Sequence, residues 1–394
     1  MSGEQGGPDP AAAPGRRVGA LAGARPGPLL LCTGGIHGNE PAGVRALEQV
    51  LAELEREPGA FRGRLLGLAG NLAALRRNTR YLDVDLNRAW RPDRLALVDR
   101  EQVPVDSECL EQRELLAELR AAIGQAREQV CFLDLHTSSA PGTPFACIGD
   151  TLRNRRFAKP FAVPVILGLE EQIDGALLEH LNNAGLVTLG FEGGQHQAPE
   201  SVENHAAAIW TGLLAAGCLP PGDARVRRAR ELLRSRGGDV PRVLEIRYRH
   251  GLRPEDEFRM RPGFRNFCEV RAGQVLADDS RGGIEAFYPA RVLLPLYQGL
   301  GDDGFFLARE VSRFWLRLSW WMRRLRLDRL VHWLPGVRRH PSRAGALLVD
   351  QRVARWFTIE VFHLLGYRKR RQEGGLLVVS RRAHDLRQPQ RIRI

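Results

Sequence analysis

Lysine is almost absent from this sequence. Only Lys159 and Lys369 occur, so nearly all of the positive charge comes from arginine. A GC-rich genome raises the arginine, alanine and glycine contents together, and we attribute most of the arginine-to-lysine ratio to such a bias. It does not explain where along the chain the positive charge lies.

The sequence also lacks a Cys-x-x-Cys pair and long apolar runs. Its six cysteines are scattered, a pattern that fits neither a disulfide framework nor a cysteine zinc site and favours a reducing compartment. No segment reaches the ~18 apolar residues of a membrane-spanning helix, and residues 1–28 lack the apolar run of ~7–15 residues of a signal peptide. We therefore expect a cytoplasmic protein with a disordered segment at 1–28.

The positive charge is concentrated in one region. The 394 residues include 58 Lys and Arg against 46 Asp and Glu, a formal net charge of +12. Residues 311–394 hold 20 of the basic and 5 of the acidic residues, which leaves 38 basic and 41 acidic residues in 1–310. The chain is thus a near-neutral body with a basic extension, and no specific nucleic-acid partner is expected.

Apolar runs alternate with helical patterns in the first half of the chain. Runs typical of buried strands lie at 29–32, 65–69, 130–135, 161–167 and 186–191. This alternation predicts an α/β domain over 29–220 with a mixed sheet flanked by helices, in which functional loops gather at the carboxyl ends of strands. Short strand-like segments predict a smaller β-rich domain over 225–310, followed by an Arg/Trp-rich extension over 311–394.

The sharpest local feature is Gly35-Ile36-His37-Gly38-Asn39-Glu40. A histidine and a carboxylate three residues apart can face one zinc ion, and a third protein ligand leaves a position for water. His136 follows a predicted buried strand and is a candidate third ligand, with Asp134 as a candidate partner that orients it. Read singly, a His-x-x-Glu or a buried histidine is more often structural.

Two further segments carry polar groups suited to catalysis. Arg80 and the pair Asn87 and Arg88 offer planar donors for a carboxylate or a developing oxyanion, although a surface loop with ion pairs is an alternative. Glu192 ends an apolar run and precedes two glycines. A carboxylate there is able to take a proton from a metal-activated water and return it to a leaving amine, but alone it is an ordinary glutamate at a strand end.

Together these motifs resemble the succinylglutamate desuccinylase/aspartoacylase family, which belongs with the zinc carboxypeptidase-like hydrolases. The resemblance rests on four segments in the same order, 35–40, 78–88, 134–136 and 192–194, and covers about residues 29–215. It implies a zinc carboxypeptidase-like α/β fold and one zinc ion per chain. It also implies hydrolysis of the amide bond of a small anionic N-acyl amino acid.

The resemblance also assigns roles to single residues. It implies that His37, Glu40 and His136 bind the zinc ion and that Arg80 polarises the scissile carbonyl together with the metal. Glu192 then acts as general base and afterwards as general acid.

The implied substrate-binding residues are Asn87, Arg88 and Tyr297. Aspartoacylases carry a further arginine about ten residues before the catalytic glutamate, where it binds a second carboxylate. This chain has no arginine at 181–184, so specificity for N-acetylaspartate is not implied.

Two other functions stay open on the same sequence. A zinc carboxypeptidase or peptide amidase is able to use the same site, and assays of N-acyl amino acids against short peptides separate these activities. A weakly catalytic scaffold that docks its basic aromatic tail on an acidic or membrane surface is the other alternative. The zinc content and a Glu192 variant test it.

Residues 311–334 combine basic and aromatic side chains, including four of the seven tryptophans. Their spacing predicts a helix with an aromatic face and with Arg313, Arg317 and Arg324 on the opposite face. We favour packing of the aromatic face on the protein's own body, or on a second copy in a homo-oligomer. Peripheral contact with a membrane is the alternative.

Overall fold

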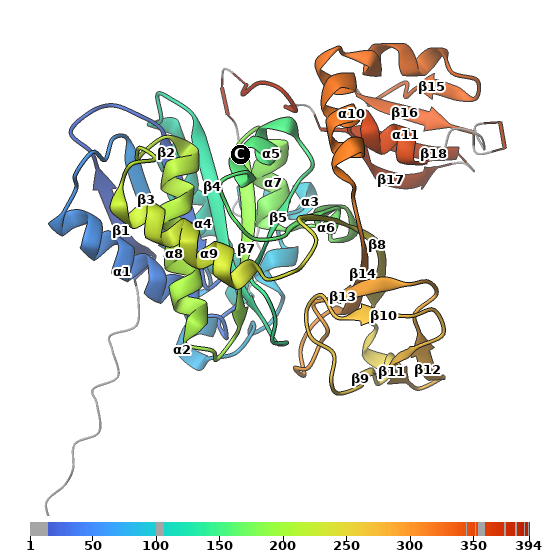
Figure 1. Ribbon diagram of the computed structural model, residues 1–394, viewed down its shortest axis with the longest axis horizontal. Helices are drawn as coiled ribbons and strands as arrows, with labels where there is room; N and C mark the ends of the chain where they lie inside the picture. Colours follow the sequence, from blue (N-terminus) through green and yellow to red (C-terminus); the bar gives the residue numbers. More distant parts are fainter. Residues whose placement is uncertain are drawn as a thin grey trace, which may run out of the picture.

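The computed structural model describes residues 15–99, 106–343, 345–350, 352–353, 359–373, 376–382, 384–389, 391–392 and 394. One mixed sheet of eleven strands dominates this part of the chain (Figure 1). Its first seven strands, in spatial order, are β1 (Arg17–Ala22), β3 (Arg64–Ala69), β2 (Leu29–Gly34), β4 (Val130–Ser138), β7 (Val187–Gln195), β5 (Phe145–Ile148) and β6 (Val165–Leu167). The sheet continues with β8 (Val243–Gly251), β14 (Asp303–Glu310), β13 (Ala290–Leu293) and β10 (Glu269–Val270).

Strand direction makes this sheet mixed. Strands β3, β2, β4 and β7 run parallel to one another, whereas β1 and β5 pair antiparallel with their neighbours β3 and β7. Strand β6 pairs parallel with β5 and β8, and all the remaining pairs are antiparallel. The predicted mixed sheet flanked by helices is therefore confirmed.

Both faces of the sheet are covered because the strand residues alternate between two cores. Leu30 and Cys32 lie in one core, and Leu29 and Leu31 in the other. The first core is completed by α1 (Ala42–Arg56), α5 (Leu152–Ala158), α8 (Glu200–Ala216) and α9 (Ala224–Gly237). The second is completed by α3 (Pro92–Asp99), α4 (Ser107–Gly124), α7 (Leu177–Asn183) and the 3-10 helix η1 (Leu86–Arg88). Two short helices, α2 (Leu72–Arg77) and α6 (Leu169–Gln172), lie in the connections.

The N-terminal prediction needs a correction. Residues 17–22 form β1, which pairs with β3 at the edge of the large sheet, so a disordered segment over all of 1–28 is wrong. Val18 and Leu21 pack against the first core, and this packing compensates for the loss of chain entropy. Residues 1–14 lie outside the described part of the chain.

The second domain differs from its predicted bounds. Residues 224–237 form α9, whose Val226, Ala229 and Leu233 are buried in the first core, so this segment belongs with the preceding α/β domain. Beyond it, β8, β14, β13 and β10 extend the large sheet. A separate three-stranded sheet consists of β9 (Arg259–Met260), β11 (Val275–Asp279) and β12 (Gly282–Glu285), preceded by the 3-10 helix η2 (Pro254–Asp256).

The basic extension has its own sheet and its own core. Four antiparallel strands follow the spatial order β15 (Val337–Arg339), β16 (Ala346–Val349), β18 (Leu376–Arg381) and β17 (Tyr367–Glu373). They pack with α10 (Arg313–Arg324), the 3-10 helix η3 (Leu327–Trp333) and α11 (Ile359–Leu364) (Figure 1).

The packing of α10 differs from the favoured prediction. Its buried side chains are Ser319 and Arg323, and Arg323 is fully buried because its guanidinium donates to the Asp150 backbone carbonyl and carboxylate, both at 2.8 Å. Phe314 and Trp321 instead remain 65% and 56% exposed. Most of the aromatic face is therefore exposed in the described part of the protein, although Met322 packs against the core of the extension. Among the described residues no helix has the length and apolar character required to cross a membrane.

Candidate functional site

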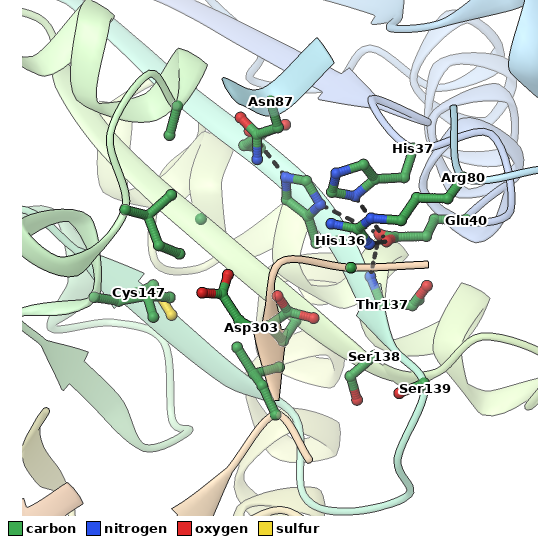
Figure 2. Close-up of a pocket in the computed structure, with 18 of the residues that line it drawn as sticks. His37, Glu40, Arg80, Asn87, His136, Thr137, Ser138, Ser139, Cys147 and Asp303 are labelled. Carbon is green, nitrogen blue, oxygen red and sulfur yellow. Dashed lines mark hydrogen bonds and ion pairs between the residues drawn. The ribbon is translucent and has the colours of Figure 1, made fainter. Parts of the chain in front are cut away.

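The predicted site residues meet at the carboxyl ends of neighbouring parallel strands. The loop after β2 carries His37 and Glu40, β4 carries His136, and β7 carries Glu192. His136 and Glu192 are direct partners in the register of β4 and β7. All four side chains line one pocket, most of whose polar residues appear in Figure 2.

Glycine determines how the loop after β2 packs. A Cβ atom on Gly38 would lie 2.1 Å from the backbone carbon of Ala74 in α2, so a larger residue forces the two segments apart. The amide N–H of Gly38 donates to the carbonyl of Arg80 at 3.1 Å. This close approach places the loop beside the polar segment 78–88.

His37, Glu40 and His136 form a buried cluster. The Nδ1 atom of His37 lies 2.9 Å from Glu40 Oε1, and the Nδ1 atom of His136 lies 3.2 Å from Glu40 Oε2. The amide N–H of Thr137 donates to Glu40 Oε2 at 2.8 Å and helps to fix the carboxylate. One ligand atom from each of the three side chains lies within 4.8 Å of the other two.

Each histidine of the cluster has a second carboxylate on its other ring nitrogen. His37 Nε2 lies 3.1 Å from Asp85 Oδ1, and His136 Nε2 lies 3.1 Å from Asp134 Oδ2. Asp134 and His136 are two residues apart on β4, so their side chains share one face of the sheet. Such outer carboxylates hold a metal-binding histidine in the correct tautomer and leave its other nitrogen for the metal.

The donor set therefore fits a divalent cation. Two imidazoles and one carboxylate are the ligands of many catalytic zinc sites. Burial alone would raise the pKa of Glu40, but the charges and hydrogen bonds of His37 and His136 outweigh burial and hold this pKa well below its usual range. Burial would likewise lower the pKa of His136, but Asp134 and Glu40 hold it well above its usual value. The surrounding carboxylates thus favour positive charge at this point.

Arg80 lies beside the cluster. Its Nη2 atom donates to Asp85 Oδ2 at 3.1 Å, and its Nη1 atom lies 3.7 Å from Glu40 Oε1. The side chain is only 12% exposed, so the guanidinium is held between the cluster and the pocket.

Glu192 differs from the other carboxylates because it lacks a cation partner. Its Oε2 atom is buried and has no hydrogen-bond partner in the described part of the chain. Burial raises the pKa of Glu192 to about 7. A carboxyl group with a pKa near neutrality is able to accept and release a proton at ordinary pH.

Asn87 and Arg88 also line the pocket. Asn87 Oδ1 accepts a hydrogen bond from the Leu177 amide at 3.0 Å, which fixes the side chain against α7. The Nη2 atom of Arg88 donates to Asp303 Oδ2 at 2.8 Å. Asp303 begins β14, so the second domain contributes directly to the pocket.

The structure does not bring Tyr297 to this pocket. Its hydroxyl donates to the Arg261 carbonyl at 2.9 Å and accepts from the Phe264 amide at 3.0 Å. The next residue, Gln298, lines the pocket instead. Its Oε1 atom lies 3.1 Å from His196 Nε2, while His196 Nδ1 lies 2.7 Å from Thr137 Oγ1.

Sequence reasoning missed the pocket residues His196, Gln298 and Asp303 and the outer carboxylate Asp85. The sequence could have indicated Asp85, because this residue lies in the same polar segment as Arg80 and Asn87. No local pattern marks Gln298 or Asp303, since both come from a part of the chain more than 100 residues after β7.

Comparisons with known proteins find the same family. Residues 26–206 match the family model described as "Succinylglutamate desuccinylase/Aspartoacylase catalytic domain". A 61-residue segment is 46% identical to the succinylglutamate desuccinylase of Photorhabdus laumondii and covers 16% of this chain and 19% of that relative. A longer alignment, with the succinylglutamate desuccinylase of Serratia proteamaculans, is 29% identical over 270 residues and covers 63% of this chain and 74% of the relative.

A solved structure has the same fold. The succinylglutamatedesuccinylase/aspartoacylase of Rhodobacter sphaeroides aligns with a TM-score of 0.52 and 21% sequence identity, over 73% of this chain and 87% of that one. The chain spans only about a fifth of the length of the first curated relatives that it matches.

Proposed function

Because residues 26–206 belong to the succinylglutamate desuccinylase/aspartoacylase family of hydrolases, we propose that this chain hydrolyses the amide bond of an N-acyl amino acid with one zinc ion. One observation carries the proposal. The buried cluster of His37, Glu40 and His136 shares its pocket with Glu192, an unpaired carboxyl group on the adjacent strand.

The metal would be held by the Nδ1 atoms of His37 and His136 and by the carboxylate of Glu40, because Asp85 and Asp134 occupy the other ring nitrogens. When bound, the zinc ion supplies Lewis acidity, which lowers the pKa of water and polarises a carbonyl oxygen. The two outer carboxylates keep both rings oriented toward that position.

Glu192 is the proton carrier. Its carboxylate takes a proton from the attacking water as the water oxygen bonds to the amide carbon. It then gives this proton to the amide nitrogen as the carbon–nitrogen bond breaks, which releases the acid and the amine. The pKa of about 7 suits both transfers.

The two pocket arginines have different tasks. Arg80 is fixed by Asp85 beside the cluster, where it donates to the oxygen that becomes negatively charged when the amide carbon turns tetrahedral. Arg88 and Asn87 bind the carboxylate of the substrate's amino acid.

Two variants test the proposal. We expect Glu192→Gln to retain zinc, measured by elemental analysis, and to lose about 10²–10⁴-fold in turnover of N-acyl amino acids. His37→Ala should lose the zinc. Glu200→Gln, at an exposed position on α8, is the matched control and should be unaffected. A folded protein that binds no zinc, or an active Glu192→Gln variant, contradicts the proposal, and a preference for short peptides points to a peptidase instead.

We also propose that residues 311–334 bind an anionic membrane surface. Seven large apolar side chains of this segment are exposed, namely Phe314, Trp315, Trp320, Trp321, Leu325, Leu330 and Trp333. Helix α10 contains no acidic residue and exposes Arg313, Arg317 and Arg324. Tryptophan prefers the membrane interface, and clustered arginines attract anionic lipids.

Vesicle flotation tests this surface. The protein should float with phosphatidylglycerol vesicles and not with phosphatidylcholine vesicles, and Trp321→Ala should weaken flotation more than Trp321→Phe. Equal recovery with both vesicles, or a dimer that buries these side chains, contradicts membrane binding.

A further inference from the structure

One part of the catalytic pocket is apolar. It is lined by Cys147, Leu169, Ile173, Leu178 and Phe306, which we call the apolar end. Cys147 and Phe306 belong to one buried core, and Leu169 and Ile173 pack against it. Figure 2 places Cys147 across the pocket from Glu40 and Arg80, with Asp303 between them.

Gly190 leaves room at this end of the pocket. A Cβ atom on Gly190 would lie 3.3 Å from Leu178 Cδ2 and 3.8 Å from Cys147 Cβ. These two side chains therefore flank the glycine, and a side chain at this position would press against Leu178.

None of the described residues that line the apolar end is cationic. Among the described residues that line the pocket, the only arginines are Arg80 and Arg88, and no lysine is present. Arg80 lies across the pocket from Cys147 (Figure 2), and Arg88 is the group proposed to bind the first substrate carboxylate, so neither is left for a second one.

Among the described residues near this end, no further cation is free for a second substrate carboxylate, because Arg249, which is not part of the pocket lining, is paired with Asp303. Asp303 lies between the cluster and Cys147 (Figure 2), and Asp302 Oδ2 lies 3.7 Å from Arg88 Nε. A carboxylate at the apolar end would lose its water without gaining a counter-ion, which is costly. An aliphatic or aromatic group there gains free energy from the burial of apolar surface.

We infer that the amino acid of the substrate has an uncharged, apolar side chain and that this side chain binds at the apolar end. The inference rests on the proposed hydrolase activity. It assigns Arg88 to the one carboxylate of the substrate and assigns Ile173 and Leu178 to the selection of its side chain.

A substrate panel tests the inference. Zinc-loaded protein should hydrolyse N-acetyl-L-leucine and N-acetyl-L-phenylalanine with kcat/KM at least about 100-fold above the values for N-acetyl-L-aspartate and N-succinyl-L-glutamate. A preference for either substrate with the additional carboxylate overturns the inference and leaves the hydrolase proposal intact. If none of the four substrates is hydrolysed, the proposed function fails, and the inference fails with it.

A charged substitution tests whether the apolar end selects the side chain of the substrate. Ile173 is half-buried at the C-terminal end of α6, so Ile173→Arg adds a cation to the apolar end. This variant should lose at least about 10-fold in kcat/KM for N-acetyl-L-leucine and gain activity on N-acetyl-L-aspartate. Ile173→Leu should keep the original preference, and zinc content verifies that both variants retain the site. An unchanged preference in a zinc-loaded Ile173→Arg protein overturns the assignment.

Discussion

Glu40 is buried and Glu192 is half-buried at the same edge of the sheet, and their surroundings push their pKa values in opposite directions. The charges of His37 and His136 hold the pKa of Glu40 low despite its burial. Glu192 has no such partner on Oε2, and burial raises its pKa to about 7. Such a separation supports the proposed division of work between the carboxylates, in which Glu40 is a charged metal ligand and Glu192 a proton carrier.

The same reasoning makes Asp134 a positioning residue. Asp134→Asn removes a charged partner from His136 Nε2, so we expect zinc affinity to fall about 10–100-fold, measured by competition with a chromogenic chelator. Asp278→Asn, at an exposed ion pair with Arg261, is the control and should bind zinc as the unaltered protein does. Equal affinity in the two variants would show that Asp134 does not act through His136.

Site residues were predictable where they lie close together in the sequence or directly follow an apolar run. His37 and Glu40 are three residues apart in one loop, and His136 follows an apolar run, so pattern and spacing pointed to them. Asp303 reaches the pocket only because β14 pairs with β8, a contact between residues far apart in the sequence. Local sequence carries no signal for such a contact.

At the scale of elements, loop packing depends on a glycine. Gly38→Ala places a methyl group against the backbone of Ala74, so we expect the free energy of unfolding to fall by about 1–3 kcal/mol, measured by urea denaturation. Gly124→Ala is the matched control, because a Cβ atom on Gly124 at the end of α4 meets no other atom within 4 Å. The prediction is wrong if both variants unfold at the same urea concentration.

The helices and strands that were predicted correctly are those whose sequences show a clear pattern of apolar residues. Strands β2 and β4 each begin with an apolar run, are almost entirely buried and lie in the middle of the sheet. Strand β1 was missed because only Val18 and Leu21 of its side chains pack on the core. Helix α10 was predicted, but the burial of Arg323 was not, since it depends on Asp150 in another domain.

At the scale of the whole molecule, Arg323 joins the basic extension to the catalytic domain. Its Nη2 atom lies 2.8 Å from Asp150 Oδ2, and both side chains are fully buried. The same guanidinium donates to the carbonyls of His363 and Leu364, so one side chain holds α10 against both α11 and the catalytic sheet. The extension is therefore anchored by specific hydrogen bonds rather than by its surplus charge.

The buried ion pair between Arg323 and Asp150 leads to a prediction about the stability of the extension. Arg323→Ala leaves buried acceptors without their donor, and loss of one partner from a buried ion pair costs about 3–5 kcal/mol. We expect a lower thermal midpoint and faster proteolysis within residues 311–394, with zinc content and kcat/KM unchanged because Arg323 does not line the catalytic pocket. The neighbouring Arg324→Ala, at an exposed position, removes the same charge without breaking a buried pair and should leave both readouts unaltered. Equal proteolysis of the two variants would mean that the extension is held by its general charge, whereas selective cleavage of Arg323→Ala identifies the buried pair as the link between the two parts of the molecule.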